Sequence, residues 1–151
     1  MESLAMSKAL AAFNTLGPES FGSMMCQQAP YFSTIQPKLV DLKPEYAEAW
    51  VPFRKEITNH LGTVHAIALC NAAELVAGLM TDASLPGDGR WIPQAMSVKY
   101  LAKAKTDLRA IANGKEIDWS STGKKTVPVE VFDEDGLLVF TAEITMNVKL
   151  S

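Results

Sequence analysis

Hydrophobic and polar residues alternate most regularly near the C-terminus. Between residues 138 and 148 every even position is apolar, and from residue 141 every odd position is polar. This period of two predicts a long strand with one buried face. Val127, Val129 and Val131 alternate in the same way, and Asp133-Glu134-Asp135-Gly136 between the two segments is typical of a hairpin turn.

Weaker patterns predict the other elements. Residues 91–101 and 105–112 indicate two further strands, the second closed by Asn113-Gly114, and residues 34–42 and 47–54 are expected to be extended. Apolar residues between positions 4 and 15 recur at helical spacing until Gly17-Pro18, which is expected to end that N-terminal helix within residues 1–17. A less regular region is expected after it.

The longest apolar run, residues 66–80, predicts a helix that is hydrophobic on nearly every side. Many of its residues are alanine or glycine, which would let a sheet approach closely. Such a helix has to be covered all round, so the predicted fold class is α+β, with antiparallel strands wrapped around one long helix. Residues 1–151 are the length of a single domain.

Composition narrows the possible functions. The chain is 48% hydrophobic and 21% charged, with a net charge of -3 and a pI near 5.4, which argues against a nucleic-acid partner. The apolar run is shorter than the roughly 18–20 residues of a membrane span, and we see no signal peptide, so no membrane association is expected. Cys26 and Cys70 are expected to be free thiols of a cytoplasmic protein. Two histidines without ligand spacing predict no metal site.

Two polar residues interrupt the apolar helix. Asn71 and Glu74 are three residues apart and so project from the same side. Burying an unpaired carboxylate costs several kcal/mol or raises its pKa. Either these side chains reach solvent or bond each other in a structural role, or they belong to a functional site.

The start of the helix favours the functional alternative. Gly62 or Thr63 can cap the helix, which would place His65 and Ala66 in its first turn, next to Asn59. Free backbone N–H groups and the helix dipole at this end favour an anion or a polarised carbonyl. The arrangement is suited to an oxyanion hole.

Helical geometry separates this end from the carboxylate. The nine residues from His65 to Glu74 correspond to a rotation of about 900°, half a turn out of phase, and a rise of roughly 13–14 Å. The two ends of one chain therefore cannot act on the same small group. A shared reaction requires the donors of one subunit to meet the carboxylate of another across a two-fold interface.

The pattern Asn59-x-x-Gly62-x-x-His65, with an acid nine positions later, resembles the hotdog-fold acyl-CoA thioesterases of the phenylacetyl-CoA type. Residues 100–104 (Tyr-Leu-Ala-Lys-Ala) are similar to that family's Y-x-x-P-A strand motif, and the likeness covers roughly residues 47–150. The resemblance implies a hotdog fold, a curved antiparallel sheet around one central helix. It also implies a homodimer with two composite sites, or a dimer of such dimers.

The resemblance further implies hydrolysis of acyl-CoA or acyl-carrier-protein thioesters without a cofactor, coenzyme A being part of the substrate. The Ala66 N–H would polarise the thioester carbonyl. Asn59 and His65 would hold the loop and the nucleophile, and Glu74 of the other subunit would be general base or nucleophile. We assign Gly62, Asn71, Ser97, Lys99 and Lys103 to substrate binding. Ser97 is the nearest match to an assisting Ser or Thr, and the lysines, predicted to share a strand face with Lys105, suit a coenzyme A phosphate.

Departures from the motif leave two other functions open. Ala66-Ile67 stands where the family has Gly-Gly, and Lys103 replaces its proline. The first change favours a non-catalytic acyl-CoA or lipid-binding protein with the same fold. An acyl-thioester dehydratase or hydratase fits less well, because the histidine followed by Pro-Gly of those families is missing.

Overall fold

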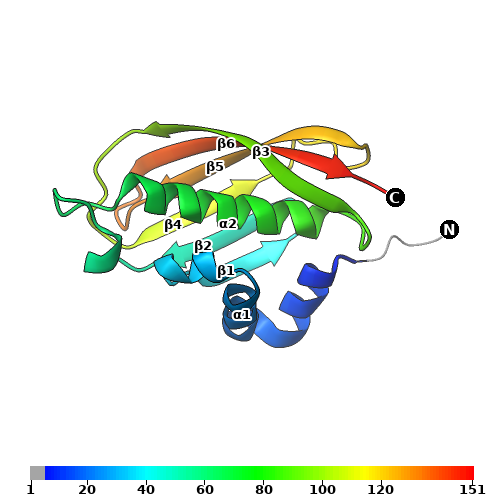
Figure 1. Cartoon of the computed structure of the whole chain (residues 1–151), viewed down its shortest axis with the longest axis horizontal. Coiled ribbons are helices and arrows are strands. Elements are labelled where there is room, and N and C mark those ends of the chain that lie inside the picture. Colours follow the sequence, from blue (N-terminus) through cyan, green and yellow to red (C-terminus); the bar gives the residue numbers. More distant parts are fainter. Residues whose placement is uncertain (1–5) are drawn as a thin grey trace.

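A six-stranded antiparallel sheet curves around one long helix in the computed structural model, which describes residues 6–151 (Figure 1). The strand order is β1-β2-β4-β5-β6-β3. The predicted α+β class and the sheet wrapped around one helix are confirmed. Along the chain the elements are α1 (Lys8–Gln28), a 3-10 helix η1 (Pro30–Ile35), β1 (Lys38–Lys43), β2 (Tyr46–Val51), a 3-10 turn η2 (Lys55–Ile57), α2 (Ala66–Ser84), β3 (Arg90–Tyr100), β4 (Leu108–Asn113), β5 (Gly123–Phe132) and β6 (Leu138–Lys149).

The C-terminal hairpin follows the alternation of the sequence. β5 pairs with β6 so that Val127, Val129 and Val131 lie opposite Ile144, Ala142 and Phe140, all buried. At the turn, the Gly136 N–H donates to the Asp133 carbonyl at 3.1 Å, and Gly136 has a φ of 83°, which glycine adopts without strain. The predicted strands and hairpin are confirmed here.

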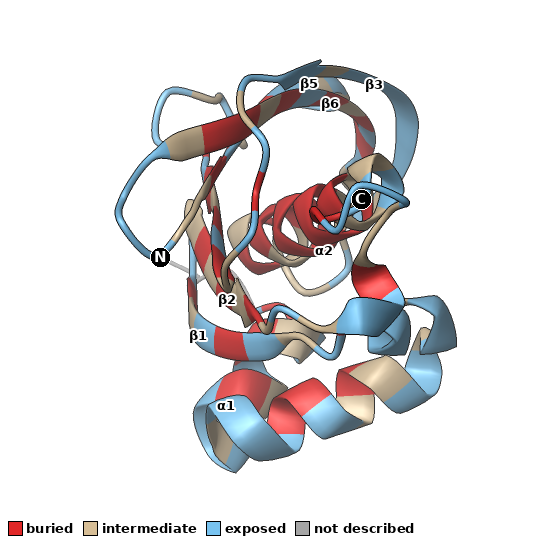
Figure 2. Cartoon of the chain, turned by 90° about the vertical axis from the view of Figure 1, so that its left-hand side faces the viewer, coloured by how far each residue is buried: buried red, intermediate tan, exposed pale blue. Residues whose placement is uncertain are grey.

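Small residues let the sheet close on α2. Ala72, Ala73 and Ala77 are 0% exposed, and Gly78 is buried beneath the ring of Trp91 on β3. The helix extends to Ser84, beyond the predicted end at residue 80. Its 19 residues would be long and apolar enough to cross a membrane, but here they form the core that the sheet covers (Figure 2).

The N-terminal region contains more helix than predicted. Gly17 has a φ of 83° and a ψ of 168° and does break the helix, as expected. Helix then resumes at Pro18 and continues to Gln28, because proline is well tolerated in a first helical turn. The expectation of a less regular region was therefore wrong. This helix packs against β1, and Leu4 and Ala5 lie outside the described residues.

Two predicted strands begin later than expected. In the segment 34–42, Thr34 and Ile35 belong to η1 and the strand begins at Lys38. In the segment 105–112 it begins at Leu108, so Lys103 and Lys105 lie in the connection before β4 and not on a strand face with Lys99. The prediction of a lysine face along one strand was wrong.

One face of α2 is left open between β3 and η1. Ile67 on this face is 53% exposed, and Cys70 and Glu74 are half-buried. β3 borders the opening at the end of the sheet, where it pairs with β6 and with no other described strand. Ile92, Met96 and Tyr100 of this strand are exposed.

The Gly78–Trp91 contact provides a test of the packing. A Cβ at position 78 would lie 2.7 Å from the Trp91 ring, so Gly78→Ala should lower the free energy of unfolding, through overpacking of about 1–3 kcal/mol. In a Trp91→Ala background the same change should raise stability, by about 1 kcal/mol, because alanine is the better helix former. Urea unfolding of the four proteins measures the coupling.

Gly22 on α1 is the matched control, since a Cβ there would meet Leu39 at an ordinary 3.9 Å. Gly22→Ala should be neutral or stabilising in both backgrounds. Additive effects of Gly78→Ala and Trp91→Ala would contradict the described packing.

Candidate active site

Asn59 organises the loop that leads into α2. Its Oδ1 accepts hydrogen bonds from the backbone N–H groups of Leu61 (2.9 Å) and Thr63 (3.2 Å), while its Nδ2 donates to Thr63 Oγ1 (2.8 Å). Gly62 closes the same turn at a φ of 77°, with its N–H donating to the Asn59 carbonyl at 3.0 Å. The amide of Asn59 thus holds the loop. The predicted role also included positioning the nucleophile, for which this amide has no further described contact.

His65, and not Gly62 or Thr63, is the N-cap of α2. Its Nδ1 accepts a hydrogen bond from the Ile67 N–H at 3.0 Å. The imidazole therefore replaces the hydroxyl or carboxylate that usually caps a helix. A neutral ring bound in this way carries its proton on Nε2.

Ala66 is the first residue of α2, and its N–H has no acceptor among residues 6–151. A helix leaves its first N–H groups without intrahelical partners. Ala66 borders a hollow of about 310 Å³, the β3-side hollow, which lies between the loop, the start of α2 and the end of β3. Its lining includes Asn59, Ala66, Tyr100 and Lys103.

Glu74 occupies the open face of α2, two turns further along. Its carboxylate is half-buried and has neither an ion-pair nor a hydrogen-bond partner within the described part of the chain. It borders an apolar cavity of about 340 Å³ whose walls include Phe32, Leu79 and Trp91. An unpaired carboxylate of this kind is a candidate general base or nucleophile.

Asn71 does not bond to Glu74, so the alternative in which these two side chains bond each other was wrong. Its amide is 7% exposed and faces η1, where Nδ2 donates to Thr34 Oγ1 at 3.1 Å and more weakly to the Tyr31 carbonyl at 3.4 Å. The Asn71 Oδ1 is buried without a donor among residues 6–151. Asn71 and Glu74 therefore share a helix side but have different surroundings.

The other predicted binding residues lie apart from one another. Ser97 and Lys99 are exposed on β3, opposite Glu143 and Thr141 of β6. Lys103 is exposed at the β3-side hollow, next to the Ala66 end of α2. Only Lys103 of these three borders a hollow together with a predicted catalytic residue.

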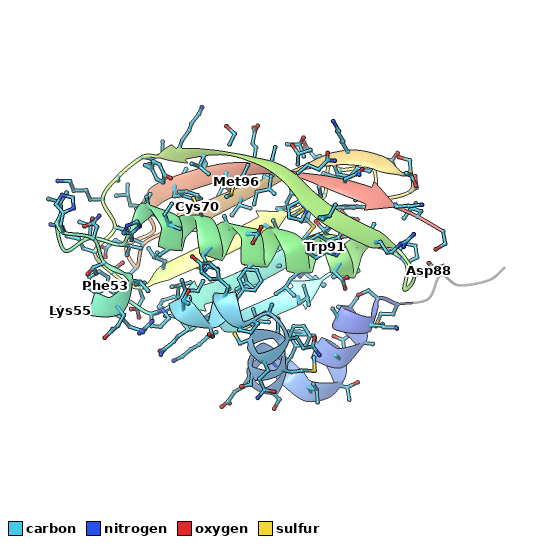
Figure 3. All side chains as sticks on the ribbon, in the orientation of Figure 1. Phe53, Lys55, Cys70, Asp88, Trp91 and Met96 are labelled. Carbon is cyan, nitrogen blue, oxygen red and sulfur yellow. The ribbon has the colours of Figure 1, made fainter. Side chains whose placement is uncertain are left out.

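A Cys70–Tyr100 contact joins α2 to β3 beside the same hollow. The thiol and the phenol oxygen are 3.7 Å apart, and hydrogen bonding to Cys70, then burial, raises the pKa of Tyr100. Figure 3 shows Cys70 on α2 and Met96 on β3 along the opening, with Trp91 further down β3. The sequence predicted only a free thiol at Cys70; its place four residues after Ala66, on the same helix stripe, was the available signal for a position beside the hollow.

No group of three or more His, Cys, Asp or Glu side chains suited to a metal ion occurs in residues 6–151.

Comparison with known families now adds to this geometry. A family model described as a domain of unknown function, DUF4442, matches residues 17–148. The chain belongs to the DUF4442 family. No curated protein matches it.

Solved structures place this DUF4442 chain among hotdog-fold proteins. The crystal structure of genomics target APC5556 is 54% identical, with a TM-score of 0.87 over 97% of this chain and 99% of the other. Thioesterase HI1161 from Haemophilus influenzae is 14% identical, with a TM-score of 0.71 over 79% and 82% of the two chains. The smu.793 protein of Streptococcus mutans UA159, solved bound to acetyl CoA, is 17% identical, with a TM-score of 0.66 over 75% and 88%. The predicted hotdog fold is confirmed, and the structures similar in fold include a protein named a thioesterase.

The loop geometry generates a stability prediction. Asn59→Ala should lower the free energy of unfolding by about 2 kcal/mol, because several backbone and side-chain hydrogen bonds of the loop lose their partner. His60→Ala, at the exposed neighbouring position, should change it by less than about 0.5 kcal/mol. Urea denaturation compares the two; equal effects would contradict the organising role of Asn59.

Proposed function

We propose that this DUF4442 chain hydrolyses acyl-CoA or acyl-carrier-protein thioesters in a site shared between two copies. One copy contributes the Ala66 N–H, and the other contributes Glu74. The observation that carries the proposal is the unpaired, half-buried Glu74 carboxylate on the open face of the helix whose first residue, Ala66, has a free N–H. The thioesterase named among the fold neighbours, and the acetyl CoA bound to another, support the choice of substrate.

The separation along α2 supports the shared site. Ala66 and Glu74 are eight residues apart on one straight element, about 12 Å along its axis, so one thioester cannot contact both in the same chain. A two-fold axis between antiparallel copies of α2 would bring each N-terminus to the partner's carboxylate.

The β3 edge supplies a surface for that pairing. β3 has 11 residues at the end of the sheet, with Ile92 60% exposed and Tyr100 54% exposed. Long exposed edges with apolar side chains are rare in proteins that stay monomeric. Pairing of β3 with β3 of a second copy would cover the edge and face the two open sides of α2 toward each other.

The proposed reaction uses the two groups in turn. Glu74 takes a proton from a water molecule while the water oxygen attacks the thioester carbon, and the Ala66 N–H stabilises the oxyanion that forms. Collapse of this intermediate breaks the carbon–sulfur bond. The proton on Glu74 passes to the departing thiolate, and the products are the carboxylic acid and the coenzyme A thiol. Lys103 at the β3-side hollow is suited to a coenzyme A phosphate.

Removing the carboxylate is the first test. Glu74→Gln should lower kcat for hydrolysis of acyl-CoA thioesters by about 100-fold or more, because the general base is lost. Glu143→Gln, an equivalent change at an exposed position of β6, should leave kcat unchanged. The measurement is the rate of hydrolysis of a panel of acyl-CoA thioesters. Equal rates for wild type and Glu74→Gln would rule out Glu74 as the base. If wild type binds acyl-CoA without hydrolysing it, the protein is the non-catalytic acyl-CoA-binding alternative. The feature of the structure that agrees with this alternative is the exposed Ile67 beside the cap.

Removing the single N–H is the matching test. Ala66→Pro deletes this donor with little change of structure, because proline suits the first helical position and His65 already has φ -62° and ψ 139°, which a following proline requires. Hydrolysis should fall by about 100-fold. Ala66→Gly, which keeps the N–H, should remain active.

Mixing the two inactive variants tests the sharing of the site. A heterodimer of Glu74→Gln and Ala66→Pro chains contains one intact composite site, so random mixing after unfolding and refolding should restore about a quarter of wild-type activity. Sites contained within single chains would give no recovery.

A further inference from the structure

The cavity of about 340 Å³ beside Glu74 is apolar except for that carboxylate. Nine residues line it, and Glu74 is the only one of them with a charged or amide side chain. The indole N–H of Trp91, another lining residue, donates to Asp82 Oδ1 at 3.2 Å and is therefore already paired. Within residues 6–151 the other lining side chains offer no partner to a polar group, and burying an unpaired polar group costs free energy. The cavity thus suits an apolar ligand whose polar part stays near Glu74.

Four segments of the chain form the walls of this cavity. α2, β3 and η1 contribute Leu75, Gly78, Leu79, Trp91, Pro93 and Phe32. The end of α1 adds Met25, and Ala29 follows directly after that helix. Met25 is only 8% exposed, whereas Pro93 is exposed, which indicates that Met25 lies at the closed end and Pro93 at the rim. The N-terminal helix therefore closes a cavity that α2 and the sheet leave open.

The position of Glu74 indicates which part of the substrate enters the cavity. In the proposed reaction Glu74 directs a water molecule to the thioester carbon, and the acyl chain begins at that carbon. The acyl chain therefore starts at the cavity wall of the copy that supplies the carboxylate. Burying one methylene group tightens binding about fourfold, so an acyl chain gains affinity with every carbon that the cavity holds.

We propose that this cavity binds the acyl chain and that Met25 limits its length, so that the preferred substrates are thioesters of apolar, medium-length acyl groups of up to about ten carbons. The inference rests on the proposed function, because it takes Glu74 as the group beside the thioester carbon. If a methylene group occupies about 30 Å³, like a water molecule in the liquid, 340 Å³ holds about eleven of them at most. Part of this volume lies at the open rim, which lowers the number that are fully buried.

Binding measurements on the Glu74→Gln chain test the length limit while the thioester stays intact. Isothermal titration with straight-chain acyl-CoAs from butanoyl to tetradecanoyl, each below its micelle concentration, gives the Kd as a function of acyl length. The Kd should fall about fourfold for each added methylene up to about ten carbons and then stop falling, because further carbons lie outside the cavity.

Two substitutions in the Glu74→Gln chain should move this limit in opposite directions. Met25→Ala removes the sulfur and two carbons from the closed end, so the limit should rise by about three carbons. Ala29→Leu adds a similar volume to the wall, so the limit should fall by about three carbons. Met24→Ala is the matched control, since the neighbouring methionine of α1 does not line the cavity, and it should leave the limit unaltered.

The outcomes separate this inference from the proposed function. A Kd that does not depend on acyl length, or a limit that both Met25→Ala and Ala29→Leu leave in place, would overturn the inference. Because the wild-type length series needs neither variant, this test does not depend on how well they fold. A limit near ten carbons that shifts as expected, combined with no hydrolysis by wild type, would support the acyl cavity and refute the hydrolase. Hydrolysis of butanoyl-, octanoyl- and dodecanoyl-CoA by wild type at equal kcat/KM would do the reverse.

Discussion

Close contact between the sheet and the small-residue face of α2 is the constraint on which the rest of the structure depends. Ala72, Ala73 and Ala77 are fully buried, and Gly78 lets the Trp91 ring lie directly on the helix. A sheet that curves this tightly still covers only part of a helix. The side between β3 and η1 therefore remains open, and the polar chemistry of an otherwise apolar helix is found there.

This arrangement explains why the candidate site is divided. The helix N-terminus supplies free N–H groups, held by the Asn59 loop and the His65 cap, while the carboxylate lies two turns further along the helix, on its open face. Because α2 is straight, the two groups of one chain stay apart. A second copy, paired along β3, is the simplest way to bring donor and carboxylate together.

The pattern of the sequence was sufficient for elements whose burial is regular along the chain. The β5–β6 hairpin and α2 follow directly from a period of two and from a run of small apolar residues. The second half of α1 was missed because Gly17-Pro18 signals an end, although proline also begins helices well. The cap was misassigned because an imidazole seldom takes that role. The partners of Asn71 lie in η1, some 40 positions earlier in the chain, where no local pattern reports them. Lys103 and Lys105 were placed wrongly on a strand because the sequence pattern did not show that β3 ends before them, at Tyr100.

A crystal structure of the wild-type chain with a thioether analogue of an acyl-CoA, which cannot be hydrolysed, tests the shared site most directly. The account predicts that the analogue's carbonyl oxygen lies about 3 Å from the Ala66 nitrogen, with Glu74 of the partner subunit on the opposite side of the carbonyl carbon. A ligand whose carbonyl contacts groups of a single chain, or lies away from the start of α2, would contradict it.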